Sequence, residues 1–168
     1  FHQDAPLQFT PVPVNEGIDH NRSHGVVVAD FDRDGDLDLV VGHSRSRCDT
    51  TRPNDCYETR QVRFFENILG ETGNWVQLDL VGGTGSNRAA IGARVSLQTE
   101  MTVQTREVSG GYGHFGAQND RVVHFGLGSA CTGQVTIQWP DSERSTTRLT
   151  IHAGVRYRVA QDGEVSEL

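Results

Sequence analysis

Five aspartates alternate with other residues between Asp30 and Asp38, a segment that we call the acidic loop. Ca²⁺ takes six to eight oxygen ligands, and carboxylates at loop positions 1, 3 and 5 can converge on one ion when glycine at position 6 makes a sharp turn. Asp30, Asp32 and Asp34 occupy those three positions, and Gly35 provides the turn. The spacing therefore predicts a Ca²⁺ site in the acidic loop.

The other ligands follow from the later loop positions. Position 7 normally contributes its backbone carbonyl, so we assign that role to Asp36 and expect its side chain to point away. An EF-hand supplies Glu at position 12, but this chain has Val41 there, which leaves Asp38 at position 9 to close the shell. Zn²⁺ would favour His or Cys ligands, and Mg²⁺ is rarely enclosed by protein ligands alone. The predicted metal ligands are Asp30, Asp32, Asp34, Asp36 and Asp38.

A solvated acidic turn without metal is the alternative interpretation of the acidic loop. It is disfavoured because the close carboxylates would repel one another and the glycine would fall at position 6 by coincidence. A shell of four carboxylates and a carbonyl leaves room for roughly one or two waters, and Ca²⁺ activates water poorly compared with zinc. The pattern predicts a structural or bridging ion rather than a catalytic one.

Both flanks of the acidic loop have strand sequences, Gly25–Ala29 before it and Leu37–Val41 after it, which predicts a β-hairpin. Apolar and polar residues alternate with a period of two along much of the remaining chain, and no segment has convincing helical periodicity. Further strands are predicted at residues 62–66, 76–80, 93–97, 102–108, 121–125, 135–139, 147–151 and 155–159. The predicted fold is all-β, an antiparallel β-sandwich with the amino-terminal calcium-loop hairpin packed on it.

Turn-forming residues between Gly70 and Gly73 predict a boundary between a calcium-binding segment, residues 1–70, and a β domain, residues 71–168. The first part is short and rich in loops, so we expect it to need packing against the second part. The chain opens on Phe1 without a signal-peptide pattern, from which we expect a processed form or a fragment.

The composition argues against several functional classes. All 15 basic residues are arginine, so no lysine is present for a Walker-type phosphate loop or a Schiff base. The net charge is −7 without a basic stripe, which argues against a nucleic-acid partner. No apolar run approaches the roughly 18 residues of a membrane span. Because no nucleophile and base pair is recognisable, we predict no catalytic residues and no enzymatic activity.

Cys48 and Cys56 lie eight residues apart in a polar segment without metal-ligand spacing. This favours a local disulfide and an oxidising compartment over two free thiols. Such a disulfide would stabilise the fold by about 2–3 kcal/mol. Cys131 is left over, and we predict that it is a small buried residue.

Two further segments could contact a ligand. Tyr112, His114 and Phe115 lie in a glycine-rich connection and, if exposed, could stack on a sugar. Residues 43–63 contain five arginines against three acids and could grip a sulfated or carboxylated partner, although a solvated surface is the ordinary interpretation.

Two stretches of the chain resemble known families. Residues 25–42 resemble the FG-GAP/VCBS repeat of integrin-type β-propellers, whose loop binds Ca²⁺ through the same pattern. Residues 87–95, 106–108, 110–113, 124–128 and 135–140 resemble the ASPIC/UnbV family, which follows FG-GAP repeats in secreted proteins related to cartilage acidic protein. The resemblance implies an extracellular Ca²⁺-binding protein of β architecture with an adhesive or binding role, and it supplies no catalytic residues.

The chain departs from these family patterns at two points. It has one FG-GAP unit where a propeller needs several, which implies the end of a longer protein or a compact variant. It also reads Asp-Ser-Glu at residues 141–143, where the family tends to have glycine.

We therefore expect an extracellular calcium-binding module with a non-catalytic adhesion or ligand-binding role. The expected partner is a protein or a glycan, with anionic ligands among the candidates, or the rest of a longer parent chain. The expected location is secreted or extracellular, with the periplasm as an alternative. The alternative function is a calcium-dependent hydrolase that uses the ion and a nearby histidine, His24 or His43.

Overall fold

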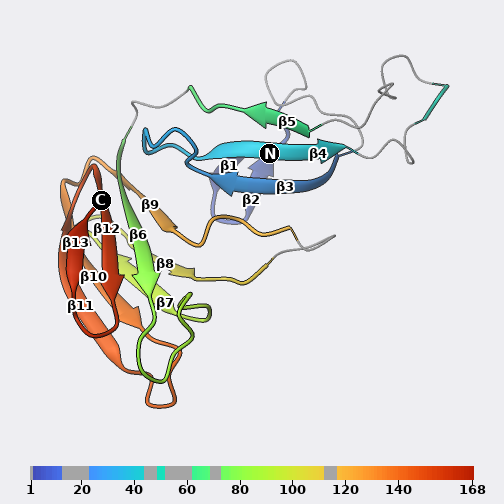
Figure 1. Ribbon diagram of the computed structural model, residues 1–168. Helices are drawn as coiled ribbons and strands as arrows, with labels where there is room; N and C mark the ends of the chain where they lie inside the picture. The colour runs from blue at the N-terminus through green and yellow to red at the C-terminus, as the bar shows by residue number, and fades with distance from the viewer. Residues whose placement is uncertain (1, 13–22, 44–48, 52–61, 69–72, 112–116) are drawn as a thin grey trace.

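The computed structural model describes residues 2–12, 23–43, 49–51, 62–68, 73–111 and 117–168. These residues form strands, turns and loops, and no helix occurs among them (Figure 1). The strands are β1 (His2–Ala5), β2 (Gln8–Thr10), β3 (Ser23–Ala29), β4 (Asp38–His43), β5 (Val62–Phe65), β6 (Asn74–Val81), β7 (Arg94–Gln98), β8 (Val103–Glu107), β9 (Val123–Gly128), β10 (Thr132–Gln138), β11 (Thr146–His152), β12 (Val155–Ala160) and β13 (Val165–Glu167). The described part of the chain thus contains no helix that could span a membrane.

Two four-stranded sheets form a sandwich, with strand orders β11-β10-β7-β8 and β13-β12-β6-β9. The period-two alternation turns one side of each strand inward, so one apolar core forms between the sheets. Trp139, Phe125 and Leu78 are among its largest fully buried side chains. The all-β sandwich predicted from the sequence is confirmed.

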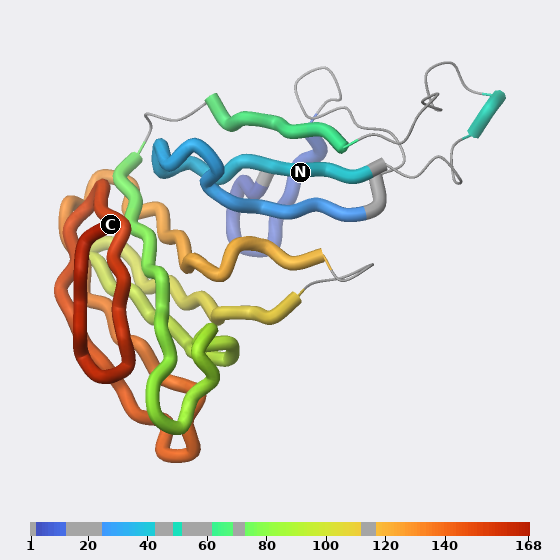
Figure 2. The backbone as a smooth tube through the Cα atoms, in the orientation of Figure 1, coloured from blue at the N-terminus to red at the C-terminus, as the bar shows by residue number. Residues whose placement is uncertain are grey.

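One strand pair differs from the antiparallel prediction. β12 runs parallel to β6, with Val155 opposite Val76 and Val159 opposite Leu80. The chain enters β12 through a turn from β11, which belongs to the other sheet, so β12 begins beside the start of β6. The Gly154 amide donates to the Trp75 carbonyl at 2.8 Å and fixes this entry point. In Figure 2 the green segment of β6 lies beside the red segment of β12.

The amino-terminal half contributes a three-stranded sheet in the order β3-β4-β5 and a separate β1-β2 hairpin. β3 and β4 form the predicted antiparallel hairpin, with Ala29 opposite Asp38 at its end. The acidic loop connects these two strands and points toward the start of β6 (Figure 1). The sheet of β3, β4 and β5 therefore presents the acidic loop to the sandwich.

Most predicted strands agree with the observed ones to within a few residues at their ends. β1, β2 and β13 were not predicted, because they are short and their described residues are mostly exposed, so they lack an apolar alternation. Cys131 was predicted to be buried, which is wrong: it lies in the exposed turn between β9 and β10. Cys48, Cys56 and the 112–116 segment lie outside the described residues.

Candidate metal centre

Side-chain to backbone hydrogen bonds shape the acidic loop. Asp30 accepts from the Arg33 amide through Oδ1 at 2.7 Å and from the Gly35 amide through Oδ2 at 3.1 Å. Asp32 Oδ1 accepts from the Asp34 amide at 3.2 Å. Such bonds from Asp side chains compete with regular secondary structure and favour turns. The alternating aspartates therefore fold the loop back on itself between β3 and β4.

Three carboxylates of the acidic loop converge. One oxygen each from Asp30, Asp32 and Asp38 lies within 4.8 Å of the other two. Asp34 Oδ1 instead accepts from the Asp36 amide at 2.8 Å, and neither Asp34 nor Asp36 belongs to the converging group. The predicted roles of Asp34 as a carboxylate ligand and of Asp36 as a carbonyl ligand stay predictions.

Asp38 is the buried member of this group, with 1% of its surface exposed. Its Oδ2 accepts from the Phe31 amide at 3.0 Å, and its Oδ1 accepts from the Asn67 amide at 2.8 Å. These bonds hold the carboxylate in place at the start of β4. Buried carboxylates normally have a cationic partner or a metal, but no arginine among the described residues pairs with Asp38.

The negative charges of the loop act on one another. The pKa of Asp32 lies above its ordinary value of 3.8. The hydrogen bond from the Asp34 amide lowers it, but desolvation and the carboxylates of Asp34, Asp38 and Asp30 together raise it further. The converging carboxylates are thus an electrostatically unfavourable arrangement without a cation.

The donor set and its spacing fit a hard divalent cation. Ca²⁺–oxygen distances of about 2.3–2.6 Å place two ligands of one ion at most about 5.2 Å apart. The spacing among Asp30, Asp32 and Asp38 is within that range. All three offer carboxylate oxygens, which Ca²⁺ prefers over softer ligands. The residues present can therefore hold such an ion.

The acidic loop rests on the outer face of the sandwich, against β6 and β9. Asp30 Oδ2 accepts from Gln77 Nε2 at 2.5 Å, and His124 Nε2 is hydrogen-bonded to the Gly35 carbonyl at 2.7 Å. Gln77 is only 2% exposed although it points away from the sandwich core. The acidic loop therefore covers this part of the outer face.

Gly35 lies directly against the Trp75 indole. A Cβ built on Gly35 would lie 1.9 Å from Trp75 Nε1, and the backbone there has a φ of +100°. Both facts require glycine at this position. The residue that makes the turn in the acidic loop is therefore also the residue that allows the loop to reach the sandwich.

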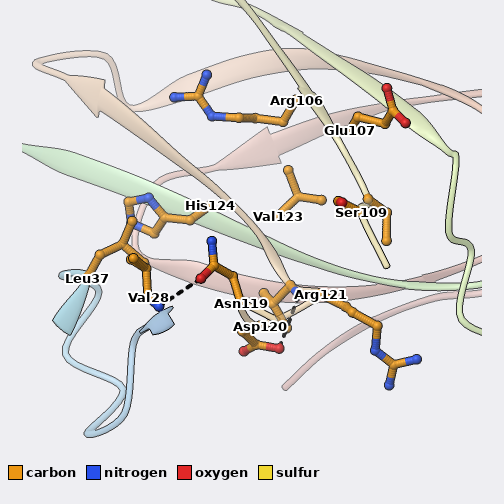
Figure 3. Close-up of a pocket in the computed structure, with 12 residues that line it drawn as sticks. Val28, Leu37, Arg106, Glu107, Ser109, Asn119, Asp120, Arg121, Val123 and His124 are labelled. Carbon is orange, nitrogen blue, oxygen red and sulfur yellow. Dashed lines mark hydrogen bonds between the residues drawn. The ribbon is translucent and has the colours of Figure 1, made fainter. Parts of the chain in front are cut away.

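A second contact joins the two halves along the edge of β3. The Val28 amide donates to Asn119 Oδ1 at 3.0 Å, and the Asp120 amide donates to the Val28 carbonyl at 3.3 Å. Figure 3 shows this contact, with Leu37 and His124 beside it. A small hollow of about 160 Å³ lies between β3 and the start of β9. The segment before β9 thus shields an otherwise free strand edge.

Sequence reasoning found the aspartates but missed Trp75, Gln77, His124 and Asn119. Gln77 fits the polar half of an alternating strand, and nothing in its local sequence distinguishes it from a solvent-facing residue. Two histidines were considered as bases for a hydrolase, but the side chains of His24 and His43 lie outside the described residues. That alternative stays a prediction.

Comparison with known proteins covers mainly the sandwich. The family described as ASPIC and UnbV matches residues 83–166, half of the chain. The acidic loop lies outside the matched residues. Cartilage acidic protein 1 of Mus musculus is 32% identical over 123 residues, which are 73% of this chain and 17% of that protein. The Homo sapiens protein of the same name is 32% identical over 123 residues, and the Xenopus tropicalis protein is 31% identical.

The aligned stretch of 123 residues is longer than the part of the chain from residue 83 onward. The similarity to these proteins therefore begins in the amino-terminal half. The chain spans about a sixth of the length of the curated relatives it matches.

Proposed function

The chain belongs to the ASPIC and UnbV family, and from this premise we propose that it is an extracellular, non-catalytic module whose acidic loop binds Ca²⁺. The bound ion is structural: it holds the amino-terminal sheet on the sandwich. The module takes part in adhesion or ligand binding, with a protein or a glycan as partner. The secreted location rests on the similarity to cartilage acidic protein 1 and on the FG-GAP/VCBS pattern of the loop.

One observation carries the metal assignment. Asp30, Asp32 and Asp38 bring carboxylate oxygens together, one of these residues is buried, and no described arginine compensates them. In water such charges would separate, so the fold holds them together at an electrostatic cost that a divalent cation would reverse. Binding Ca²⁺ would change the charge of the acidic loop from −4 to −2.

The structural role follows from what the loop contacts. Asp30 is at once a proposed ligand and the acceptor of the Gln77 bond, and Gly35 lies on Trp75. An ion that fixes the loop conformation would therefore also fix the surface that the loop presents to β6. Groups that hydrogen-bond to metal ligands usually orient them and increase metal affinity.

The absence of catalysis is proposed from the chemistry of the site. The ligands are carboxylates, which neutralise the ion, and Ca²⁺ is a weak Lewis acid for activating water. His124, the histidine placed at the loop, uses Nε2 in its bond with the Gly35 carbonyl. Among the described residues that contact the loop, none is an evident nucleophile for covalent chemistry.

Calorimetric titration of the metal-free chain with CaCl₂ tests the assignment, together with thermal unfolding in Ca²⁺ and in EDTA. With free Ca²⁺ at a hundred times its Kd, the ion should stabilise the fold by about 2.7 kcal/mol. For a chain of this length that corresponds to a rise in Tm of about 5–10 °C. Absence of both a binding heat and a Ca²⁺-dependent rise in Tm would refute the proposal.

The variant Asp32→Asn should lose most of the Ca²⁺ binding heat and most of the Ca²⁺-dependent rise in Tm. Asp32 is exposed, so the substitution removes one ligand charge without disturbing the core. We expect at least a tenfold loss in Ca²⁺ affinity. Asp162→Asn is the matched control, because Asp162 is an exposed aspartate in the turn between β12 and β13. Equal losses in the two variants would show that the response reflects general charge rather than this site.

A further inference from the structure

A hollow lined by arginines lies on the surface of the sandwich, and none of the proposed metal ligands lines it. We call it the arginine hollow. It has a volume of about 590 Å³ and is lined by Arg88, Arg121 and Arg158, with Asp79 as its acid and apolar contributions from Leu80 and Ala89. The three arginines come from different elements: the loop between β6 and β7, the segment before β9, and β12. The fold therefore gathers guanidinium groups that are distant in the sequence.

The charges in the arginine hollow are not balanced. Arg158 donates to Asp79 Oδ2 through Nε at 3.1 Å and Nη2 at 2.8 Å, so this pair is neutral. Arg88 and Arg121 make no side-chain ion pair or hydrogen bond with any described residue. The hollow thus carries an excess of two positive charges, although the whole chain carries −7.

A neighbouring hollow extends the same surface. Arg121 also lines this second hollow of about 480 Å³, together with Arg33, Arg156, Asp30 and Asp120. Figure 3 shows the Arg121 guanidinium extending away from Val28, Leu37 and His124. Arg121 also lines the small hollow at the edge of β3, so this residue borders all three hollows.

Arg156 provides an independent sign of a missing acceptor. Its Nε is buried, and no hydrogen-bond acceptor reaches it. Arg156 and Arg158 are two residues apart on β12, so both project from the outer face of the same sheet. Buried donors are nearly always paired in folded proteins. Arg156 lines the neighbouring hollow together with Arg121, not the arginine hollow itself, so its unpaired N–H indicates a missing acceptor on the surface that adjoins the arginine hollow.

We propose that the arginine hollow binds an oxyanion with two negative charges, namely a sulfate or phosphate group. Guanidinium groups present paired N–H donors that match the oxygens of such ions. An ion with two negative charges would neutralise both of the unpaired arginines that line the hollow, whereas a single carboxylate would neutralise one. The hollow is open and large enough to admit the group either as a free ion or as an ester on a larger ligand. This site does not depend on the Ca²⁺ assignment.

Titration of the ¹⁵N-labelled chain with sodium sulfate, followed by NMR, tests the proposal. The buffer contains EDTA, and ionic strength is kept constant with NaCl. We expect saturable shifts of the backbone amides of Leu80, Val81 and Ala89, which line the hollow. Arg88→Gln and Arg121→Gln should each weaken sulfate binding about tenfold. Arg148→Gln is the control, because Arg148 is an exposed arginine of β11 in the other sheet.

Three outcomes would overturn the proposal: shifts that do not saturate, shifts that NaCl alone reproduces, or equal binding by the control and the hollow variants. Succinate serves as a dicarboxylate comparator, and equal affinity for succinate and sulfate would overturn the tetrahedral oxyanion as the ligand class. Glycerol phosphate distinguishes the two sources of the group. Binding at least as tight as that of sulfate supports an ester on a larger ligand, and binding of sulfate alone supports the free ion.

Discussion

At the scale of single residues, Gly35 joins the acidic loop to the sandwich. A side chain there would overlap the Trp75 indole, and the positive φ disfavours any residue with a Cβ. We expect Gly35→Ala to lower the free energy of unfolding by about 1–3 kcal/mol, since overpacking would force the loop off the indole. Urea unfolding in EDTA measures this loss without a contribution from Ca²⁺.

Gly42→Ala is the matched control for this substitution. Gly42 lies on β4 in the same small sheet, and a Cβ there would meet no atom within 4 Å. The substitution should therefore change the free energy of unfolding by at most about 0.5 kcal/mol. If both variants lose the same stability, the contact between Gly35 and Trp75 does not hold the loop in place.

The individual residues also show where prediction from sequence stops. The aspartates were found because a metal loop concentrates its ligands within a few positions. Gln77 lies 47 residues from Asp30, and His124 lies 89 residues from Gly35. Neither residue has an unusual local sequence, so their roles depend on a fold that brings distant strands to the same loop.

At the scale of elements, Asp141 holds the turn between β10 and β11. It accepts from the Ser145 amide at 2.9 Å and from Ser145 Oγ, and Gln161 Nε2 donates to it at 2.7 Å. The hydrogen bonds from Ser145 hold the pKa of Asp141 below its ordinary value of 3.8. These bonds therefore hold the turn in place by side-chain contacts.

The lowered pKa gives the stability a defined dependence on pH. A carboxyl group whose pKa is lower in the folded state stabilises the fold above its unfolded pKa, and this contribution is lost as pH falls through the folded pKa. Asp141→Asn should therefore be less stable than the natural chain at pH 7, and the difference should shrink below pH 3.8. Urea unfolding of both chains at pH 7 and pH 3 compares them. A difference independent of pH would contradict the role of the charged form.

The strands themselves were largely predictable, because alternation follows from burying one face of a strand. Val135, Ile137 and Trp139 show this pattern, and all three are buried in the core. The order of strands in the sheets was not predictable. β6 and β12 are neighbours because the chain crosses to the other sheet in the turn after β11. The sequence of β12 itself does not indicate which strand it pairs with.

At the scale of the whole molecule, hydrogen bonds among the described residues join the two parts of the chain at two places. The acidic loop bonds to β6 and β9, and the edge of β3 bonds to residues 119–120. If Ca²⁺ orders the acidic loop, it should also strengthen the distant contact at the β3 edge, because both contacts position the same sheet. This coupling connects the ion to the arrangement of the molecule rather than to chemistry.

Gln77→Leu tests the coupling. The substitution removes the amide that donates to Asp30 and leaves a side chain of similar size, now apolar, under the loop. Loss of a hydrogen bond to a metal ligand typically costs about tenfold or more in affinity, so we expect Ca²⁺ binding to weaken by about that factor. In the natural chain, Ca²⁺ should slow hydrogen exchange of the Val28 and Asp120 amides more than that of the Ile137 amide. At the same Ca²⁺ concentration, Gln77→Leu should show a smaller slowing at Val28 and Asp120. Gln98→Leu, an exposed glutamine of β7 in the other sheet, is the control. Unchanged exchange at Val28 and Asp120 when Ca²⁺ saturates the chain would show that the ion stabilises the loop alone and leaves the junction between the two halves unaffected.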